Sequence, residues 1–139
     1  MIEKLPPPLN TQKDAEQLYI GNENASAISA STGYSLALTI THNAGSPMLV
    51  TGFHLVYLDN TLDRVPVIIN DAQRNRQIVT GNSPLCTIGV RRGQTVVAPF
   101  QKIKPFILYS GQSVQLSVLN NTGGNIAIGA LSLTLYGFQ

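Results

Sequence analysis

Apolar and polar residues alternate with a period of two along most of the chain after residue 33, which is the pattern of half-buried β-strands. In the segment Tyr34–Thr41 the tyrosine, both leucines and the isoleucine fall on one face, and Ser, Ala and Thr fall on the other. A longer strand is predicted at Met48–Leu58, where Gly52 marks a bulge or bend. Further strands are predicted at Val65–Asn70, Ile78–Thr80, Leu85–Val90, Thr95–Phe100, Ile103–Tyr109, Ser113–Asn120 and Ile126–Phe138.

Turn residues separate these segments, about eight strands in all, at intervals of roughly 8–12 residues, a spacing typical of sandwiches and barrels. The turns include Asn43–Pro47 and Asn121–Asn125, and Gly129 divides the last strand. Pro66 has no backbone N–H, so we expect its strand at the edge of a sheet. The pattern predicts an all-β fold over residues 34–139, an antiparallel β-sandwich of the jelly-roll type.

Residues 1–33 follow a different pattern, and we expect them to form an extended N-terminal arm. The three consecutive prolines at positions 6–8 favour an extended polyproline conformation. Asn10 or Thr11 is suited to cap one short helix over Lys13–Tyr19. The arm has too little apolar sequence to fold alone, so we expect it to be held against a neighbouring subunit.

Charge is scarce and uneven in this chain of 139 residues and 14.9 kDa, a size that suits one domain. Charged residues make up 12%, about half of the usual share of roughly 25%. Residues 24–58 and 105–139 contain none, whereas residues 64–104 contain seven Lys and Arg against the single acid Asp71. Because interface cores are depleted in charge, we expect much of the surface to be covered in an oligomer. A neutral surface solvated by Ser, Thr and Asn is the alternative.

The sequence contains no arrangement that predicts catalysis, a metal or a cofactor. The two histidines, His42 and His54, would lie about 20 Å apart in a hairpin, too far to share an ion. Asp59 and Asp63 share a loop, where we expect them to cap their own backbone; a weak calcium site and a catalytic carboxylate pair are the alternatives. Cys86 lies in an apolar run and is expected to be a small buried side chain. We therefore expect a protein that is not an enzyme.

The charged residues of greatest functional interest are Arg74, Arg76, Arg91 and Arg92, since Arg is enriched at protein interfaces. They are interpreted as solvated loop charges, subunit contacts, nucleic-acid contacts or contacts to a sugar or other ligand. Nucleic acid is disfavoured because no aromatic residue interleaves with them. One hypothesis is that the acidic N-terminal arm of one copy meets these basic loops in the next.

Aromatic residues are few, with no Trp, five Tyr and four Phe. Tyr57, Tyr109 and Tyr136 fall in apolar strands, and we expect them in the core. This expectation leaves few exposed rings for stacking on a sugar and counts against a carbohydrate-binding module, which is the alternative function.

The arrangement resembles that of a known group of proteins. A proline-containing arm precedes a small β-sandwich rich in Ser, Thr, Asn and Gly, and the sandwich ends in the segments Pro105–Gln112, Leu116–Asn121 and Leu133–Phe138. In this architecture the chain resembles small jelly-roll virion proteins of tailed bacteriophages, among them capsid decoration proteins and neck or tail accessory proteins. The resemblance covers residues 34–139.

The resemblance implies a homo-oligomer, with a trimer favoured, that is bound to other proteins of a capsid, neck or tail and has no catalytic activity. It implies location in the virion after synthesis in the host cytoplasm, and the N-terminus shows no signal peptide or membrane segment. A glycan remains a further candidate ligand. The candidate partner-binding residues are Leu5, Pro6, Pro7, Pro8, Leu9, Leu18, Tyr19, Arg74, Arg76, Arg91 and Arg92.

Overall fold

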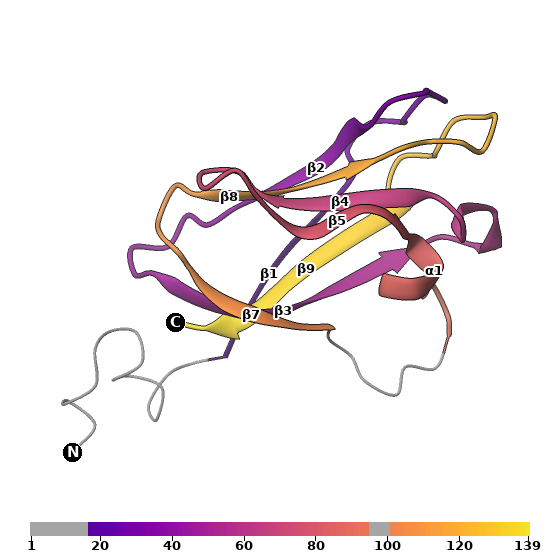
Figure 1. Ribbon diagram of the computed structural model, residues 1–139. Coiled ribbons are helices and arrows are strands. Elements are labelled where there is room, and N and C mark those ends of the chain that lie inside the picture. Colours follow the sequence, from indigo (N-terminus) through magenta and orange to yellow (C-terminus); the bar gives the residue numbers. More distant parts are fainter. Residues whose placement is uncertain (1–16, 95–100) are drawn as a thin grey trace, which may run out of the picture.

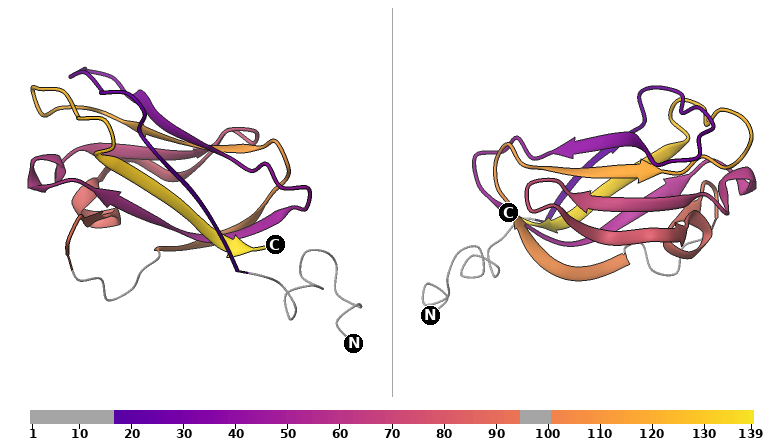
Figure 2. Two further views of the ribbon diagram at one scale, coloured as in Figure 1. Left: turned by 180° about the vertical axis from the view of Figure 1, so that it is seen from behind. Right: turned by 45° about the horizontal axis from the view of Figure 1, so that its top comes forward.

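Two β-sheets pack face to face in the computed structural model, which describes residues 17–94 and 101–139 (Figures 1 and 2). In the first sheet the strand order is β1-β9-β3, and β7 and the short β6 both pair with the other side of β3. These strands are β1 (Gln17–Glu23), β3 (Met48–Tyr57), β6 (Val90–Arg91), β7 (Gln101–Leu108) and β9 (Leu131–Phe138). The second sheet has the order β2-β8-β4-β5, formed by β2 (Ser35–Thr41), β4 (Pro66–Asp71), β5 (Arg76–Pro84) and β8 (Ser113–Val118).

The path of the chain between the sheets is that of a jelly roll. With the two-residue β6 set aside, each strand is followed by a strand of the other sheet, except that β4 and β5 form a hairpin. The first strand therefore pairs with the last, and β2 pairs with β8. Eight strands in two sheets connected in this way form a jelly roll, which confirms the predicted fold.

Apolar side chains from alternate positions fill the space between the sheets. In β9, Leu131, Leu133 and Leu135 are buried, while the residues between them face outward. β8 repeats this pattern. The largest fully buried apolar side chains are Met48, Val50, Leu55, Ile69, Leu85, Leu108, Leu116, Ile126, Leu131, Leu133 and Leu135.

Two buried asparagines connect early and late loops of the chain. The side-chain amide of Asn24 donates to the carbonyl of Ala127 (3.0 Å), and its oxygen accepts from the N–H of Leu131 (2.9 Å). The amide of Asn120 donates to the carbonyl of Ile28 (2.8 Å). Each side chain bonds backbone groups of a loop distant in sequence, so both loops are fixed to the sandwich.

Residues 17–28 belong to the sandwich, although the sequence pattern places them in the arm. β1 pairs with β9 along its whole length. Leu18 and Ile20 pack against the core, and Ile28 is 6% exposed and bridges to the segment before β9. The burial of these apolar residues holds the segment in place.

The short helix predicted over Lys13–Tyr19 is wrong where the structure tests it, because residues 17–19 are strand. A period of two puts Leu18 on the core and Tyr19 on the outside, and pairing with β9 satisfies the backbone. Residues 1–16, which include Leu5, the prolines at positions 6–8 and Leu9, lie outside the described residues.

One helical turn, α1 (Leu85–Ile88), replaces the strand predicted at Leu85–Val90. Leu85 is the residue of this turn that enters the core, and its N–H donates to the carbonyl of Val65 (3.0 Å). The turn directs Cys86 to solvent, so the prediction of a buried cysteine is wrong. The strand predicted at Thr95–Phe100 lies outside the described residues. No helix in the described ranges has the length and apolar character of a membrane span.

Local irregularities account for other differences between pattern and structure. The bulge predicted at Gly52 is confirmed by a register shift between Val50 and Gly52. A second shift between Leu36 and Leu38 turns Leu36 outward, where it is 55% exposed, against the predicted alternation. Pro66 begins β4, which lies between β8 and β5 rather than at an edge. A proline is tolerated as the first residue of a strand because its missing N–H falls at the end of the ladder.

Candidate functional site

The histidines and loop acids have roles inside the fold. His42 is buried, and its Nε2 donates to the carbonyl of Ser46 (2.6 Å). The hairpin considered for His42 and His54 does not form, because β2 and β3 lie in different sheets. Asp59 accepts from the N–H of Thr61 (3.0 Å), which confirms the predicted backbone cap for Asp59, whereas Asp63 accepts from a side chain instead. Across residues 17–94 and 101–139, no three His, Cys, Asp or Glu side chains form a group that could hold a metal ion.

Asp63 links the loop before β4 to β3 and β6. Its carboxylate accepts from the hydroxyl of Tyr57 (2.7 Å) and lies 3.7 Å from Nε of Arg91. Burial, together with this hydrogen bond, raises the pKa of Tyr57 to about 12. Tyr57 is 2% exposed, which confirms its predicted place in the core.

Arg74 and Arg76 form a cluster with a buried acid and an aromatic ring. Nη1 of Arg74 lies 2.8 Å and Nη2 of Arg76 lies 3.8 Å from the carboxylate of Asp71, which is 0% exposed. Both guanidinium groups stack over Phe106 of β7, at 5.9 and 5.3 Å from the ring centroid. Arg74 also donates to the carbonyl of Ile107 (2.6 Å). The arginines therefore join the β4–β5 hairpin of one sheet to β7 of the other.

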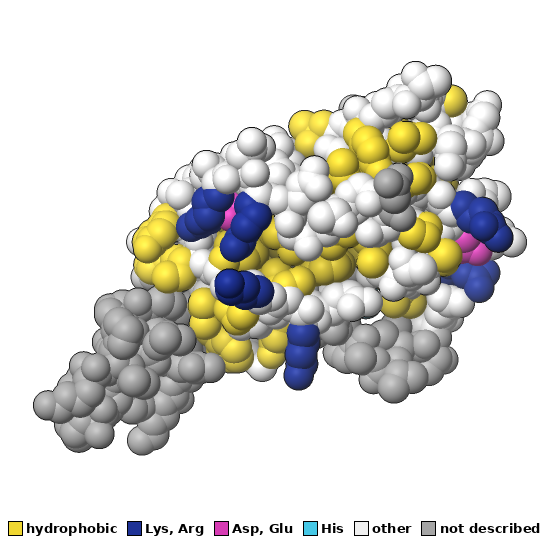
Figure 3. Space-filling model, viewed as in Figure 1, with side chains coloured by type: hydrophobic (Ala, Val, Ile, Leu, Met, Phe, Trp, Pro, Cys, Tyr) yellow, Lys and Arg dark blue, Asp and Glu magenta, His cyan; other side chains and the backbone are white. Residues whose placement is uncertain are grey.

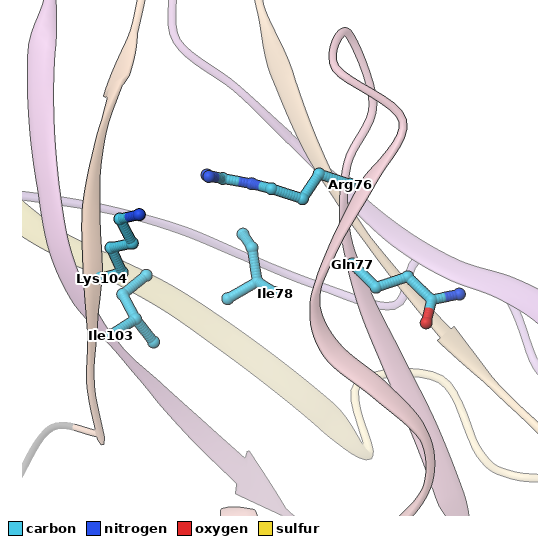
Figure 4. A pocket seen from close by; sticks show the side chains of 5 residues that line it. All are labelled: Arg76, Gln77, Ile78, Ile103 and Lys104. Carbon is cyan, nitrogen blue, oxygen red and sulfur yellow. The ribbon is translucent and has the colours of Figure 1, made fainter.

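A hollow of ≈ 220 Å³ lies between β5 and β7, each of which forms an edge of its sheet at this side of the sandwich. Its lining residues are Arg76, Gln77, Ile78, Ile103 and Lys104. Figure 4 shows Arg76 and Ile78 pointing from β5 toward β7, while Gln77 points away. Apolar side chains line the space between the sheets, and basic side chains stand beside it (Figure 3). The basic side chains beside this hollow are suited to contact an acidic surface.

We expect Asp71→Asn to destabilise the protein by about 2–3 kcal/mol, because it removes the charged acceptor of this cluster. Arg91→Gln is the matched control, since it removes a half-exposed pair at 3.7 Å and should cost less than about 1 kcal/mol. Urea unfolding followed by circular dichroism measures both. Equal losses in the two variants would show that the Asp71 cluster does not contribute more than a surface pair.

Arg91 and Arg92 lie at the opposite end of β4 from Arg74 and Arg76. Arg91 contacts Asp63 before the strand begins, whereas Arg74 contacts Asp71 at its end, and six strand residues span about 20 Å. Nη2 of Arg92 donates to the carbonyl of Gly129 (2.9 Å). A second hollow of ≈ 330 Å³ lies here, lined by Leu58, Asp59, Asn60, Arg91, Arg92, Gly93 and Gln94. The structure therefore forms two separate basic sites from the four predicted arginines.

The predicted residues Leu18 and Tyr19 point to opposite sides of β1. Leu18 packs against the core, whereas Tyr19 is 51% exposed on the outer face of the first sheet. Its ring centroid lies 5.3 Å from that of Tyr136, which lies 6.0 Å from that of Phe138. We call Tyr19, Tyr136 and Phe138 the aromatic ladder. Tyr136, expected in the core, lies half-buried on this outer face.

Sequence reasoning missed an apolar patch on the outer face of the second sheet. Leu36 is 55% and Tyr34 is 37% exposed there. A Cβ at Gly81 would lie 3.1 Å from the Tyr34 hydroxyl oxygen and 3.6 Å from Cδ1 of Ile68, so the tyrosine reaches across the sheet to β5. The bulge in β2 that exposes Leu36 does not change the alternation of apolar and polar residues, so the sequence pattern does not predict it. Tyr109 was also expected in the core but is 50% exposed after β7.

Charged side chains are absent from four of the described strands, β2, β3, β8 and β9. These strands are neighbours, since β9 lies beside β3 and β2 lies beside β8. The charge segregation along the sequence thus becomes a segregation in space, with Arg76, Lys102 and Lys104 collected along β5 and β7. No protein-family model matches the sequence, and no curated protein is significantly similar to it.

Proposed function

We propose that the protein is a non-enzymatic structural protein of a virion, an oligomeric jelly roll that decorates or cements a phage capsid, or belongs to its neck or tail. The observation that carries this proposal is the uncharged half of the sandwich, formed by β2, β3, β8 and β9. The outer faces of the two sheets bear the apolar patch around Leu36 and the aromatic ladder. Surfaces that lack charge and expose large apolar side chains are suited to be covered by other protein.

The basic side chains along β5 and β7 are a second observation that supports the same proposal. They give the sandwich one cationic edge around the hollow beside Arg76 and Lys104. An assembly built on a scaffold needs surfaces that differ in chemistry, one for copies of itself and one for the scaffold. We assign the uncharged half to contacts between copies and the cationic edge to an acidic scaffold surface.

The full-length chain should therefore be an oligomer, with a trimer favoured, when its mass is measured by light scattering after size exclusion. The double variant Leu36→Ser and Tyr34→Ser should shift the mass toward the monomer, because it removes exposed apolar area from the patch. Leu58→Ser is the control, since Leu58 is also exposed (38%) but lies beside the second hollow. A monomeric full-length chain at all concentrations would contradict the proposed assembly. Mass spectrometry of purified particles from cells that carry the gene tests the virion location.

Carbohydrate binding is the second candidate, and it is favoured by the half-exposed ring of Tyr19 beside the amide of Gln17. Exposed aromatic rings and side-chain amides are the groups that lectins place against sugars. A glycan array with full-length protein and with Tyr19→Ala distinguishes the two functions. A signal that is lost in Tyr19→Ala would replace the structural function by glycan recognition.

A further inference from the structure

We propose that the hollow between β5 and β7 binds an extended acidic segment of a partner protein. One apolar side chain of the segment packs between Ile78 and Ile103. Carboxylates on the same side of the segment pair with Arg76 and Lys104. The inference deepens the proposed function and rests on it, because that function assigns this cationic edge to an acidic scaffold. It adds the kind of segment that the scaffold presents.

The hollow lies on the side of the sandwich where the edge strands are β5 and β7. On the opposite side the edge strands β1 and β2 are joined, since Nδ2 of Asn22 donates to the carbonyl of Thr39 (3.0 Å). On the β5–β7 side the arginine cluster bridges the two sheets near one end of β7, and the hollow lies next to this bridge. Its two isoleucines, Ile78 and Ile103, are partly buried and pack against the core. They therefore offer apolar contact area to one further side chain.

A bulge in β5 sets the pattern of side chains that face the hollow. Consecutive residues of β4 pair with Gln77 and Val79, so Ile78 is the extra residue of a β-bulge. A bulge redirects side chains, and Figure 4 shows Ile78 directed toward β7 together with Arg76. A basic and an apolar side chain two positions apart therefore face the hollow. An extended segment presents alternate side chains to one surface, so its complementary pattern is an acid, any residue and then an apolar residue.

The charges beside the hollow favour an acidic partner. Figure 4 shows Arg76 extending from β5 toward Lys104 on β7, so two cations face the same space. Within residues 17–94 and 101–139, Lys104 forms no ion pair. Arg76 shares the single carboxylate of Asp71 with Arg74, which lies closer to it (2.8 Å against 3.8 Å). One acid among three bases leaves a net positive charge, and a carboxylate in the hollow would offset it.

The size of the hollow and the residues around it narrow the choice of occupant. Its volume of ≈ 220 Å³ is below the range of about 300–1,000 Å³ that is typical of sites for drug-sized molecules, so it fits one side chain of a larger partner. No aromatic ring is among the described residues that line it, which disfavours the stacking of nucleic-acid bases. The second basic hollow is less attractive to carboxylates, because Asp59 lines it and Arg91 there faces Asp63.

The test uses two peptides of identical composition, TETLTET and TTELETT, with acetylated and amidated ends. In an extended conformation the first places its glutamates on the same side as its leucine, and the second places them on the opposite side. Each peptide is titrated into the ¹⁵N-labelled full-length protein, and binding is followed by ¹H–¹⁵N NMR. We expect TETLTET to shift the amide signals of Arg76, Ile78, Ile103 and Lys104. It should bind about tenfold more tightly than TTELETT, because only TETLTET brings leucine and carboxylates to the hollow together.

Two charge reversals on β7 distinguish a specific site from general attraction. Lys104→Glu reverses a charge at the hollow, and Lys102→Glu is the matched control, since both lysines are exposed but Lys102 does not line the hollow. We expect Lys104→Glu to weaken the binding of TETLTET about tenfold, because an attraction becomes a repulsion. Lys102→Glu should weaken it by at most about threefold, through the loss of general attraction.

Several outcomes would overturn the proposal. These are equal binding of the two peptides, equal weakening by the two lysine variants, and shifts confined to the second hollow around Arg91 and Arg92. An oligothymidine strand that shifts the same signals at lower concentration than TETLTET would assign the hollow to nucleic acid instead.

The outcomes also separate this inference from the proposed function. If the full-length chain is an oligomer and TETLTET does not bind, the inference is wrong while the proposed assembly stands. If the chain is a monomer and TETLTET binds as expected, the proposed assembly fails and the hollow remains a site for acidic segments.

Discussion

Replacing Gly137 by alanine should push β9 away from β3 and remove a large part of the stability of the protein. A Cβ at position 137 would overlap the carbonyl oxygen of Leu49 and lie 2.9 Å from its carbonyl carbon and 3.1 Å from Cα of Val50. All three atoms belong to the backbone of β3, so no side-chain rotation relieves the overlap. We expect a loss of at least about 4–5 kcal/mol, in the range of exceptional single substitutions and comparable to a total stability of about 5–15 kcal/mol.

Gly124→Ala is the matched control for this substitution. A Cβ at Gly124 would have no neighbour within 4 Å, and the residue does not have a positive φ. We expect its free energy of unfolding to change by less than about 0.5 kcal/mol. Thermal unfolding followed by circular dichroism measures both variants. Equal midpoints would mean that β9 and β3 are farther apart at the bulge than the structure places them.

A chain that starts at Gly33 should fail to fold, because it lacks β1. Its deletion leaves the edge of β9 unpaired and removes Leu18, Ile20 and Ile28 from the core. Complete burial of one such side chain contributes about 1.5–3 kcal/mol, and Ile28 is buried while Leu18 and Ile20 are partly buried, so together they contribute a large part of the marginal stability of a domain. Asn120 also loses the carbonyl of Ile28 as an acceptor.

The control for this deletion is a chain that starts at Gln17 and keeps all strands of both sheets. We expect dispersed amide signals in its ¹H–¹⁵N NMR spectrum and collapsed or missing signals for the chain that starts at Gly33. A folded protein from the shorter chain would show that β1 is dispensable and would restore the predicted domain boundary at residue 33.

The local pattern of the sequence is sufficient to predict most strands but not their partners. The alternation in β8 and β9 reports burial on one face directly, and the jelly-roll type follows from the number and spacing of such segments. β1 was not predicted because its seven residues include Gly21 and Asn22, which are typical of turns. Its hydrogen-bonding partner is β9, at the other end of the sequence, and no local pattern indicates that pairing. α1 was predicted as a strand because its four residues contain one buried leucine, and so short a segment has no periodicity that distinguishes a helical turn from a strand.

The candidate sites show the same division between local and distant information. The sequence identifies Arg74 and Arg76 as a notable pair, but their partner Phe106 lies 30 residues or more away, and nothing local links them. Asp71, close to both arginines in sequence, was the available signal for this cluster. It is the single acid among seven bases in residues 64–104, so ion pairs with some of them could be expected. Leu36 and Tyr109 were assigned to the core because both fit the alternation of apolar and polar residues. The register shift after Leu36 and the end of β7 before Tyr109 do not alter that alternation in the sequence.

The pairing of the first strand with the last has a consequence for how the protein is made. β1 leaves the ribosome before the other described strands, yet its partner β9 is not available until residues 131–138 have been synthesised. The first sheet cannot close before β9 has been synthesised, since β9 also pairs with β3. Long-range pairings of this kind fold slowly, and prematurely terminated chains keep an open sheet edge. Synthesis of β9 thus acts as a checkpoint, and copies with an intact β9 are the ones that reach the folded state.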